Sequence, residues 1–438
     1  MPNPFFLTLL PATALLLGTA AAVAQTAAPA TPQITAIRAG RLIADPRTDN
    51  GAPALLIVEG SRIHSILPAD APIPSGATVI DLSNAAVLPG LIDAHVHLAG
   101  DPGGDYRQRA VETAEHAALV GAKNANLTVK AGFTTVRDLG SSSALSSFAL
   151  RDAIREGLVP GPRILAAGRA IAIIGGHGDV NAFREDVEQA LSQNNTCTGA
   201  VECAARVRQL SKRGADVIKI TATGGVLSQQ ARGLGLHFTP EEMRSIVDTA
   251  ASLGLKVAAH AHGDDGILGA TEAGVASVDH VTFASPETLK VMKAKGTFMV
   301  PTLVALTGVS ERIGTGAYTP VVEAKGKQAL AVWGKQVQEA MKSGIKVAFG
   351  TDAGVVEHGR NAEEFRLLVD KGGMTQRQAL VSATVTSAEL LGLEDEIGTL
   401  APGKTADIIA VAGDPLNDPD SLSKMQFVMA QGKIIRLD

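Results

Sequence analysis

Cysteine is scarce in this sequence, which holds two cysteines among 438 residues. Two thiols are too few for a cysteine-rich zinc module or for a disulfide scaffold. Cys197 and Cys203 lie close together in the chain, and a bridge that closes so short a loop would add roughly 2 kcal/mol of stability on the chain-entropy estimate. We therefore expect a Cys197–Cys203 disulfide, with two free thiols as the alternative.

An excess of positive charge is also missing. The chain carries 39 Lys and Arg against 44 Asp and Glu, a net charge of −5, which excludes nucleic acid as an electrostatic partner. Hydrophobic residues make up 45% of the chain and charged residues 19%, so the chain can bury a large core and is not disordered throughout. Beyond the first segment, every long apolar run is broken by charge, Gly or Pro. We therefore expect no stable membrane span after that segment is removed.

Residues 1–24 contain no charged side chain. They hold an apolar stretch followed by the small-x-small sequence Ala22–Val23–Ala24, which is the pattern of a signal peptide cut before Gln25. Because no Lys or Arg precedes the apolar stretch, an uncleaved membrane anchor is the alternative. The pattern predicts an exported protein, either periplasmic or secreted.

Short β runs occupy residues 25–88 and return over 405–438, which predicts one small β-sandwich assembled from both ends of the chain. Residues 89–404 instead alternate apolar strand runs with helical patterns, for example helices at 240–253, 286–295 and 321–343, as in parallel βα units. Eight candidate strands span 91–97, 134–139, 163–167, 217–221, 257–260, 277–281, 298–303 and 346–351. The sequence thus predicts an α/β fold, a (β/α)₈ TIM barrel with a β-sandwich. A doubly wound sheet is the alternative, and its dinucleotide-binding form lacks a GxGxxG motif.

Ligand-type side chains stand at the ends of these strands. His95 and His97 alternate with apolar residues, so both imidazoles face the inside of the barrel mouth, where they are costly without partners. Later strands end in Lys219, His260, His280 and Asp352. Imidazole and carboxylate donors suit Zn²⁺ with open coordination positions.

Lys219 lies among β-branched residues in the segment Val217–Thr221. A desolvated lysine loses its proton more readily and becomes a nucleophile. It could then take up carbon dioxide and form a carbamate, an anionic oxygen donor able to bridge two cations. A Schiff-base lysine and a lysine at the strand edge that reaches solvent are the alternatives.

These motifs resemble the amidohydrolase superfamily of metal-dependent hydrolases. The resemblance covers nearly the whole chain, from the split sandwich and the segment Pro89–His97 to the closing Gly403–Asp407. It implies two divalent ions, usually Zn²⁺. On that pattern His95, His97 and Asp352 bind the first metal, carbamylated Lys219 bridges, and His260 and His280 bind the second. Asp352 is implied to move protons between the water and the leaving nitrogen.

The segments 175–178, 223–226 and 259–263 resemble one branch more closely, the imidazolonepropionase-like and Xaa-Pro dipeptidase-like enzymes, which includes ochratoxin-hydrolysing amidases. The resemblance implies cleavage of an amide next to a free carboxylate in a small molecule such as an N-acyl amino acid or an Xaa-Pro dipeptide. The single substrate that the resemblance suggests first is ochratoxin A, which would be cut to ochratoxin alpha and phenylalanine. The resemblance also implies a homo-oligomer, with an octamer as one such assembly.

Four residues are candidates for substrate binding. His177 lies in a Gly-rich loop that allows close approach of a ligand, although a hydrogen bond that stabilises the loop is the alternative. By strand alternation His262 points to the same side as His260. We expect it either to contact the substrate or to support the metal ligands. Gly224 and Gly225 could present backbone N–H groups.

The remaining histidines receive no catalytic role from the sequence. His237 and His358 stand in loops that could reach the barrel mouth. His64 and His116 fall in the sandwich and in the first barrel helix, where we expect structural or surface positions.

Two other functions compete with the amide hydrolase. One is a cyclic amide hydrolase of the imidazolonepropionase type, and the other is a periplasmic binding protein without catalysis. The presence of all six ligand positions argues against the binding protein.

Overall fold

The computed structural model describes residues 33–102, 107, 111–141, 144–192, 194–229 and 233–438. The predicted signal peptide at 1–24 lies outside the described residues. All elements below belong to the unit Gln33–Asp438.

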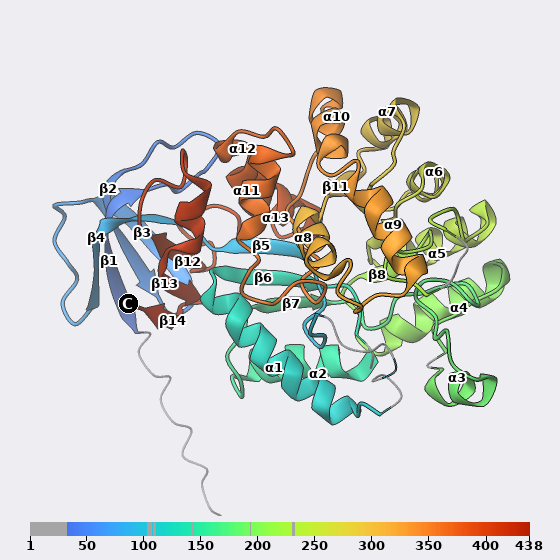
Figure 1. The fold of residues 1–438 in the computed structure, drawn as a ribbon. Helices are drawn as coiled ribbons and strands as arrows, with labels where there is room; N and C mark the ends of the chain where they lie inside the picture. Colours follow the sequence, from blue (N-terminus) through green and yellow to red (C-terminus); the bar gives the residue numbers. More distant parts are fainter. Residues whose placement is uncertain (1–32, 103–106, 108–110, 142–143, 193, 230–232) are drawn as a thin grey trace, which may run out of the picture. The chain divides into compact units, whose positions relative to one another are not determined.

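Strands from the two ends of the chain share one seven-stranded sheet, in the order β14-β13-β12-β4-β1-β2-β3. Its strands are β1 (Ile34–Leu42), β2 (Ala52–Glu59), β3 (Arg62–Pro68), β4 (Thr78–Pro89), β12 (Ile408–Val411), β13 (Met425–Ala430) and β14 (Lys433–Leu437). The junction is the antiparallel pair β4 and β12, in which Ile408 lies opposite Pro89 and Val411 opposite Ala86. Figure 1 shows these early and late strands side by side, in blue and dark red.

Side chains from both halves of this sheet share one hydrophobic cluster, which includes Ile37, Leu56, Phe427 and Met429. Burial of such side chains contributes about 1.5–3 kcal/mol each, so each chain end stabilises the other. The two β segments predicted from the sequence therefore form one β unit, as expected.

In the described part of the chain, seven parallel strands form the barrel wall, in the orders β5-β6-β7 and β8-β9-β10-β11. They are β5 (Leu91–Val96), β6 (Phe133–Asp138), β7 (Arg163–Ala166), β8 (Ile218–Thr221), β9 (Val257–Ala261), β10 (Ser277–His280) and β11 (Phe298–Val300). The backbone N–H of Asp216 donates to the carbonyl of Ala166 at 2.9 Å and so joins β7 to the start of β8.

The eighth place in the wall belongs to the segment 346–351, which was predicted as a strand. It forms no regular strand, but Ala348 N–H donates to Met299 O and Ala94 N–H donates to Phe349 O, both at 2.9 Å. These bonds place the segment between β11 and β5. The fold is therefore the expected TIM barrel with a β-sandwich.

Helices follow the strands and cover the outside of the wall (Figure 1). The helices of the described residues are α1 (Ala114–Lys130), α2 (Ala144–Glu156), α3 (Glu185–Leu191), α4 (Gly199–Lys212), α5 (Pro240–Ser252), α6 (Asp264–Ala273), α7 (Pro286–Lys295), α8 (Leu303–Arg312), α9 (Pro320–Leu330), α10 (Lys335–Ser343), α11 (Glu363–Asp370), α12 (Gln376–Val381), η2 (Ser382–Thr386), α13 (Ser387–Leu391) and η3 (Pro419–Ser423). The predicted helices at 240–253 and 286–295 are α5 and α7. The single helix predicted at 321–343 is wrong: the chain turns between α9 and α10, where Gly334 has φ 84°, a value that glycine adopts at little cost.

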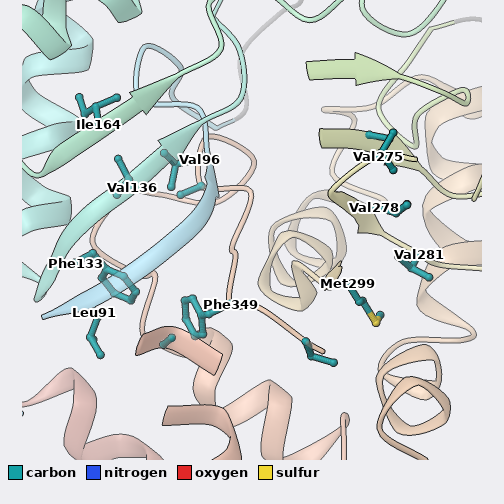
Figure 2. Packing of buried hydrophobic residues seen from close by; sticks show 14 of the residues in the cluster. Leu91, Val96, Phe133, Val136, Ile164, Val275, Val278, Val281, Met299 and Phe349 are labelled. Carbon is teal, nitrogen blue, oxygen red and sulfur yellow. The ribbon is translucent and has the colours of Figure 1, made fainter. Parts of the chain in front are cut away.

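The main hydrophobic core lies between the barrel strands and the surrounding helices. Figure 2 shows Leu91, Phe133 and Phe349 close together, with Val278 and Met299 on the other side of the barrel. All five are buried. Within the described residues, no helix combines the length and the apolar character needed to cross a membrane.

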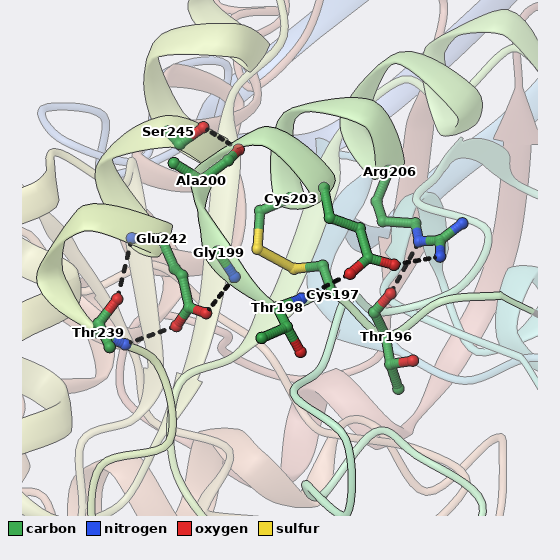
Figure 3. Close-up of a disulfide and its surroundings, with 11 residues drawn as sticks. Thr196, Cys197, Thr198, Gly199, Ala200, Cys203, Arg206, Thr239, Glu242 and Ser245 are labelled. Carbon is green, nitrogen blue, oxygen red and sulfur yellow. Dashed lines mark hydrogen bonds and ion pairs between the residues drawn. A yellow bond between two sulfur atoms is a disulfide. The ribbon is translucent and has the colours of Figure 1, made fainter.

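A disulfide joins Cys197 to Cys203, with 5.0 Å between the Cα atoms, which confirms the predicted bridge. It fixes the start of α4, as Figure 3 shows. Two carboxylates hold the same turn: Glu202 accepts from the N–H of Thr198 at 2.9 Å, and Glu242 accepts from the N–H of Gly199 at 2.7 Å. Glu242 also forms a capping box with Thr239 at the start of α5, so Glu242 ties the start of α4 to the start of α5.

Candidate active site

The six predicted metal ligands lie at the carboxyl ends of the barrel strands. His95, Lys219, His260 and His280 are buried, within or at the end of β5, β8, β9 and β10. The last three of these strands are neighbours in one sheet, β8-β9-β10. In this fold the carboxyl ends of the strands meet at the face that carries the active site.

The first donor set consists of His95, His97 and Asp352. The two histidine Nε2 atoms lie 3.3 Å apart, and Asp352 Oδ1 lies 3.4 Å from His95 Nε2 and 3.1 Å from His97 Nε2. His97 Nδ1 lies 2.7 Å from the carbonyl of Gly140. Since a carbonyl only accepts, that nitrogen carries the proton, and Nε2 of His97 is left as the metal-binding atom.

The second donor set consists of His260, His262 and His280. All three are buried, and one nitrogen from each lies within 4.8 Å of the others. Threonine hydroxyls hold two of the rings: Thr302 Oγ1 lies 2.7 Å from His280 Nδ1, and Thr282 Oγ1 lies 2.7 Å from His262 Nδ1. His262, predicted as a substrate contact, therefore lies among the ligand-type histidines. The ring centres of His95 and His280 are 5.2 Å apart, so the two donor sets lie next to each other.

Lys219 has a charged partner, Asp279, that the sequence did not predict. Its Nζ donates to Asp279 Oδ2 at 2.6 Å, and Asp279 also contacts Arg137 at 3.3 Å and His95 at 3.4 Å. Burial lowers the pKa of Lys219. Burial alone would raise the pKa of Asp279, but the positive charge of Lys219 holds it well below its ordinary value.

Strand alternation hides Asp279. Successive residues of a strand point to opposite faces, so Asp279 and His280 should not share a site. His280, however, has φ 73°, and this left-handed backbone ends the alternation. The sequence did hold one sign of this contact: Asp279 and Arg137 are charged residues in apolar strands, and a buried Asp or Arg needs a partner of opposite charge.

Left-handed backbone recurs at the site. His280, Thr302 and Asp352 all have positive φ. This conformation costs about 1–3 kcal/mol for a non-glycine residue and is found most often at functional sites.

A buried hydrogen-bond network lies next to Asp352 in the chain. Asp93 accepts from Thr351 Oγ1 at 2.6 Å and from Asn361 Nδ2 at 2.8 Å. Burial raises the pKa of Asp93 to about 6.

His177 approaches the second donor set from its loop. Its ring centre lies 4.3 Å from that of His260, and its Nδ1 lies 2.6 Å from Ser228 Oγ. Burial lowers the pKa of His177 to about 3, so the ring is neutral near pH 7. Asn195 holds the loop that carries His177, because its side-chain amide donates to the carbonyls of Ala170 and Gly178 at 2.8 and 2.9 Å.

The backbone N–H groups of Gly224 and Gly225 both have partners. Gly224 donates to Gly235 O and Gly225 to Ser228 Oγ, each at 3.2 Å. In this structure the two N–H groups are used within the protein, and the expectation that they bind a substrate stays a prediction. Their small size also matters, since a Cβ on Gly225 would lie 2.3 Å from Cε1 of His177.

The other histidines lie around this centre. His358 Nε2 lies 3.2 Å from the carbonyl of His97, and its Nδ1 lies 3.3 Å from Thr128 Oγ1, so His358 supports His97 from behind. His237 Nδ1 lies next to Gly176, 3.2 Å from where a Cβ would stand. The side chains of His64 and His116 are 62% and 67% exposed, as expected for surface positions.

Comparison with known proteins decides the family. Residues 86–435 match the sequence model described as "Amidohydrolase family". The chain belongs to the amidohydrolase family. An ochratoxinase of Aspergillus niger is 33% identical over 408 residues, which cover 88% of this chain and 82% of the relative. An imidazolonepropionase of Acinetobacter baumannii is 27% identical, over 82% of this chain and 87% of the relative.

Among solved structures, a Xaa-Pro dipeptidase with bound methionine in the active site superposes with a TM-score of 0.87 at 38% identity. The match covers 92% of this chain and 99% of that chain. These relatives place this amidohydrolase in the branch that the sequence motifs resemble. The chain is therefore a hydrolase that acts on amide bonds, and its two histidine-rich donor sets could hold metal ions.

Proposed function

We propose that this amidohydrolase binds two divalent metal ions and cleaves an amide bond next to a free carboxylate. The observation that carries the proposal is the adjacency of two complete donor sets, one of His95, His97 and Asp352 and one of His260, His262 and His280. The 5.2 Å between the rings of His95 and His280 brings the sets within reach of one substrate group.

The donors fit zinc, because imidazole nitrogen and carboxylate oxygen are the ligands that zinc takes at catalytic sites with open positions. When bound, such ions would polarise the amide carbonyl and activate a water molecule. The chain prepares its own ligands for this. Gly140 sets the proton of His97, and Thr302 orients the ring of His280.

Asp352 is the proton carrier of the proposed reaction. Its side chain is 14% exposed, so it is sheltered yet reachable by substrate. Its neighbours His95 and His97 favour the charged form, and they outweigh burial, so the pKa of Asp352 lies far below its ordinary value. An ionised carboxylate can accept the proton of the attacking water and then deliver it to the leaving nitrogen.

Lys219 is proposed to carry a carbamate. In the neutral amine, Nζ attacks carbon dioxide, one N–C bond forms, and one proton leaves, which gives an anionic oxygen donor in place of a cation. Burial supports this step, because it lowers the pKa of Lys219 and so raises the fraction of neutral amine. The charge reversal would release Asp279 from its present ion pair.

Two relatives support the substrate class. Ochratoxinase and Xaa-Pro dipeptidase are named for amide substrates, and a centre with two cations would offer positive potential to a substrate carboxylate. Ochratoxin A, an aromatic acyl group amide-linked to phenylalanine, is the first compound to test.

The experiment compares ochratoxin A with its phenylalanine-amide analogue, together with metal analysis of the purified protein. We expect about two metal ions per chain and a strong preference for the free carboxylate. Equal cleavage of the two compounds would contradict carboxylate recognition. Cleavage of only a cyclic imide or lactam would favour the imidazolonepropionase-type reaction, and binding without turnover would favour the binding protein.

We further propose that the protein is exported and acts as a homo-oligomer. The apolar first segment and the small-x-small sequence Ala22–Val23–Ala24 support export, and a disulfide suits an oxidising compartment. Mass spectrometry of the mature protein should find Gln25 at its N-terminus. Light scattering should give a mass above that of one chain.

A further inference from the structure

Helix α9 places a lysine inside the protein, close to the candidate active site. Lys325 is 5% exposed, and lysine is seldom buried without partners. Its Nζ donates to the carbonyl of Gly225 at 2.7 Å and to the carbonyl of Ser228 at 2.6 Å. These two residues are also joined by a hydrogen bond from Ser228 N–H to Gly225 O at 3.2 Å. Lys325 thus holds both ends of one turn.

The same turn holds His177. Ser228 Oγ lies 2.6 Å from His177 Nδ1, and that hydroxyl also accepts from the N–H of Gly225 at 3.2 Å. The His177 ring packs so tightly on Gly225 that an added Cβ would lie within 2.6 Å of three of its ring atoms. Both residues that Lys325 holds are therefore residues that position this imidazole.

The same imidazole lies beside the reaction centre. The ring centre of His177 lies 4.3 Å from that of His260. A small shift of the Gly225–Ser228 turn would therefore move His177 relative to the second donor set. The chain of contacts runs from α9 through Lys325 and Ser228 to His177.

We propose that Lys325 is a positioning residue of the active site, which clamps the Gly225–Ser228 turn and so fixes where His177 meets the substrate. This inference rests on the proposed amide hydrolase function and adds a residue from outside the barrel strands to it. Lysine suits the task because one ammonium group donates to two carbonyls at once. Methionine at this position fills similar space but donates to neither.

A double-mutant cycle tests the proposal. Lys325→Met and His177→Asn are made singly and together, and kcat and KM are measured with ochratoxin A on protein of equal metal content. Because misplacement of a positioned group costs up to about 100-fold, we expect each single variant to lose roughly 10- to 100-fold in kcat/KM. The double variant should be within about 2-fold of His177→Asn alone. Losses that multiply in the double variant would overturn the proposal.

Two further variants keep the test decisive. Lys327→Met lies on the same helix, with a side chain 65% exposed, and should leave both constants unchanged. If Lys325→Met does not fold, Ser228→Ala cuts the same chain of contacts one step later and should reproduce the loss, again without adding to His177→Asn. Full activity of folded Ser228→Ala would also overturn the proposal.

A readout without substrate separates this inference from the proposed function. In protein labelled with ¹⁵N-histidine, the Nδ1 resonance of His177, assigned from its loss in His177→Asn, reports the bond to Ser228. We expect Lys325→Met to shift that resonance and Lys327→Met to leave it in place. An unmoved resonance in folded Lys325→Met would refute the clamp. A shifted resonance in a protein that cuts no carboxylate-bearing amide would retain the clamp and reject the substrate class.

Discussion

Asp279 Oδ2 accepts a hydrogen bond of 2.6 Å from Lys219 Nζ, and neither side chain reaches the surface. Arg137 lies on the other oxygen of the same carboxylate, so two buried cations share one buried anion. The arrangement holds the amine of Lys219 beside the first donor set, through the contact of Asp279 with His95.

In the metal-free protein, in which Lys219 carries no carbamate, Asp279→Asn should be strongly destabilising. The change leaves Lys219 and Arg137 buried without a counter-charge, and removal of one member of a buried pair costs about 3–5 kcal/mol. Urea unfolding of the variant measures the free energy of unfolding. The matched control is Asp370→Asn, whose half-exposed ion pair with Arg366 should be worth at most about 1 kcal/mol. Equal losses in the free energy of unfolding for the two changes would contradict a stabilising role of the buried ion pairs of Asp279.

His95→Ala should lower both metal content and turnover. The change removes one donor of the first set, so we expect substoichiometric metal by elemental analysis and a kcat reduced by about 10³-fold or more. His97→Ala and Asp352→Ala should behave alike. His116→Ala serves as the control, since that side chain is 67% exposed. Full activity of thoroughly metal-free wild-type protein would refute the metal-dependent reaction.

Lys219→Ala should lose metal and activity, and a short carboxylic acid should restore part of both. The acid supplies the anionic oxygen that a carbamate would otherwise provide. In the wild type, ¹³C-labelled bicarbonate should give a carbamate resonance that disappears in Lys219→Ala. A bare amine at full metal occupancy would reject the carbamate.

Replacement of Cys197 and Cys203 by serine should lower the free energy of unfolding by about 2 kcal/mol, because the short closed loop gains conformational freedom in the unfolded chain. Urea unfolding with and without a reductant checks this. The reductant should destabilise the wild type and leave the double variant unaffected. Equal stability of the wild type and the variant would show that the bridge contributes nothing.

Glu364→Gln should change how stability depends on pH. Glu364 is buried and accepts from the backbone N–H groups of Leu303 and Val304 at the start of α8. Burial raises its pKa well above the ordinary value of 4.5. The folded protein therefore binds a proton that the unfolded chain releases, and wild-type stability from this group falls as pH rises from about 4.5 towards the raised pKa.

Glutamine cannot titrate, so the stability of Glu364→Gln relative to wild type should increase between pH 5 and pH 8. Urea unfolding at the two pH values measures this difference, and other titrating groups cancel in the comparison. A constant difference would contradict the raised pKa.

The strand ends could be predicted from the sequence because their physical signal is local. His95 and His97 stand two apart in an apolar strand, and His260 and Lys219 each follow β-branched or small apolar residues. The pattern also predicted that these ends share one face of the barrel. The same alternation placed His262 on the side of His260. Its position among the ligand-type histidines also depends on His280, at the end of β10.

Long-range partners could not be predicted in the same way. Lys325 reaches Gly225 across 100 residues of chain, and nothing in the exposed-looking pattern of α9 marks it as buried. The internal partners of the Gly224 and Gly225 N–H groups could not be predicted either, because a Gly-rich segment indicates backbone freedom but not which group the backbone contacts. The missed break between α9 and α10 depends on the backbone of Gly334, which the surrounding helix-forming residues mask.

The pairing of β4 with β12 also determines when the fold can be completed. A ribosome delivers β4 long before β12, so the edge of β4 from Ala86 to Pro89 stays uncovered while the whole barrel is being made. An unpaired edge of this kind is a template for wrong pairing. The last strands to emerge, β12 to β14, are therefore the ones that close the sheet, and a nascent chain stalled before Ile408 would be the form most prone to aggregate.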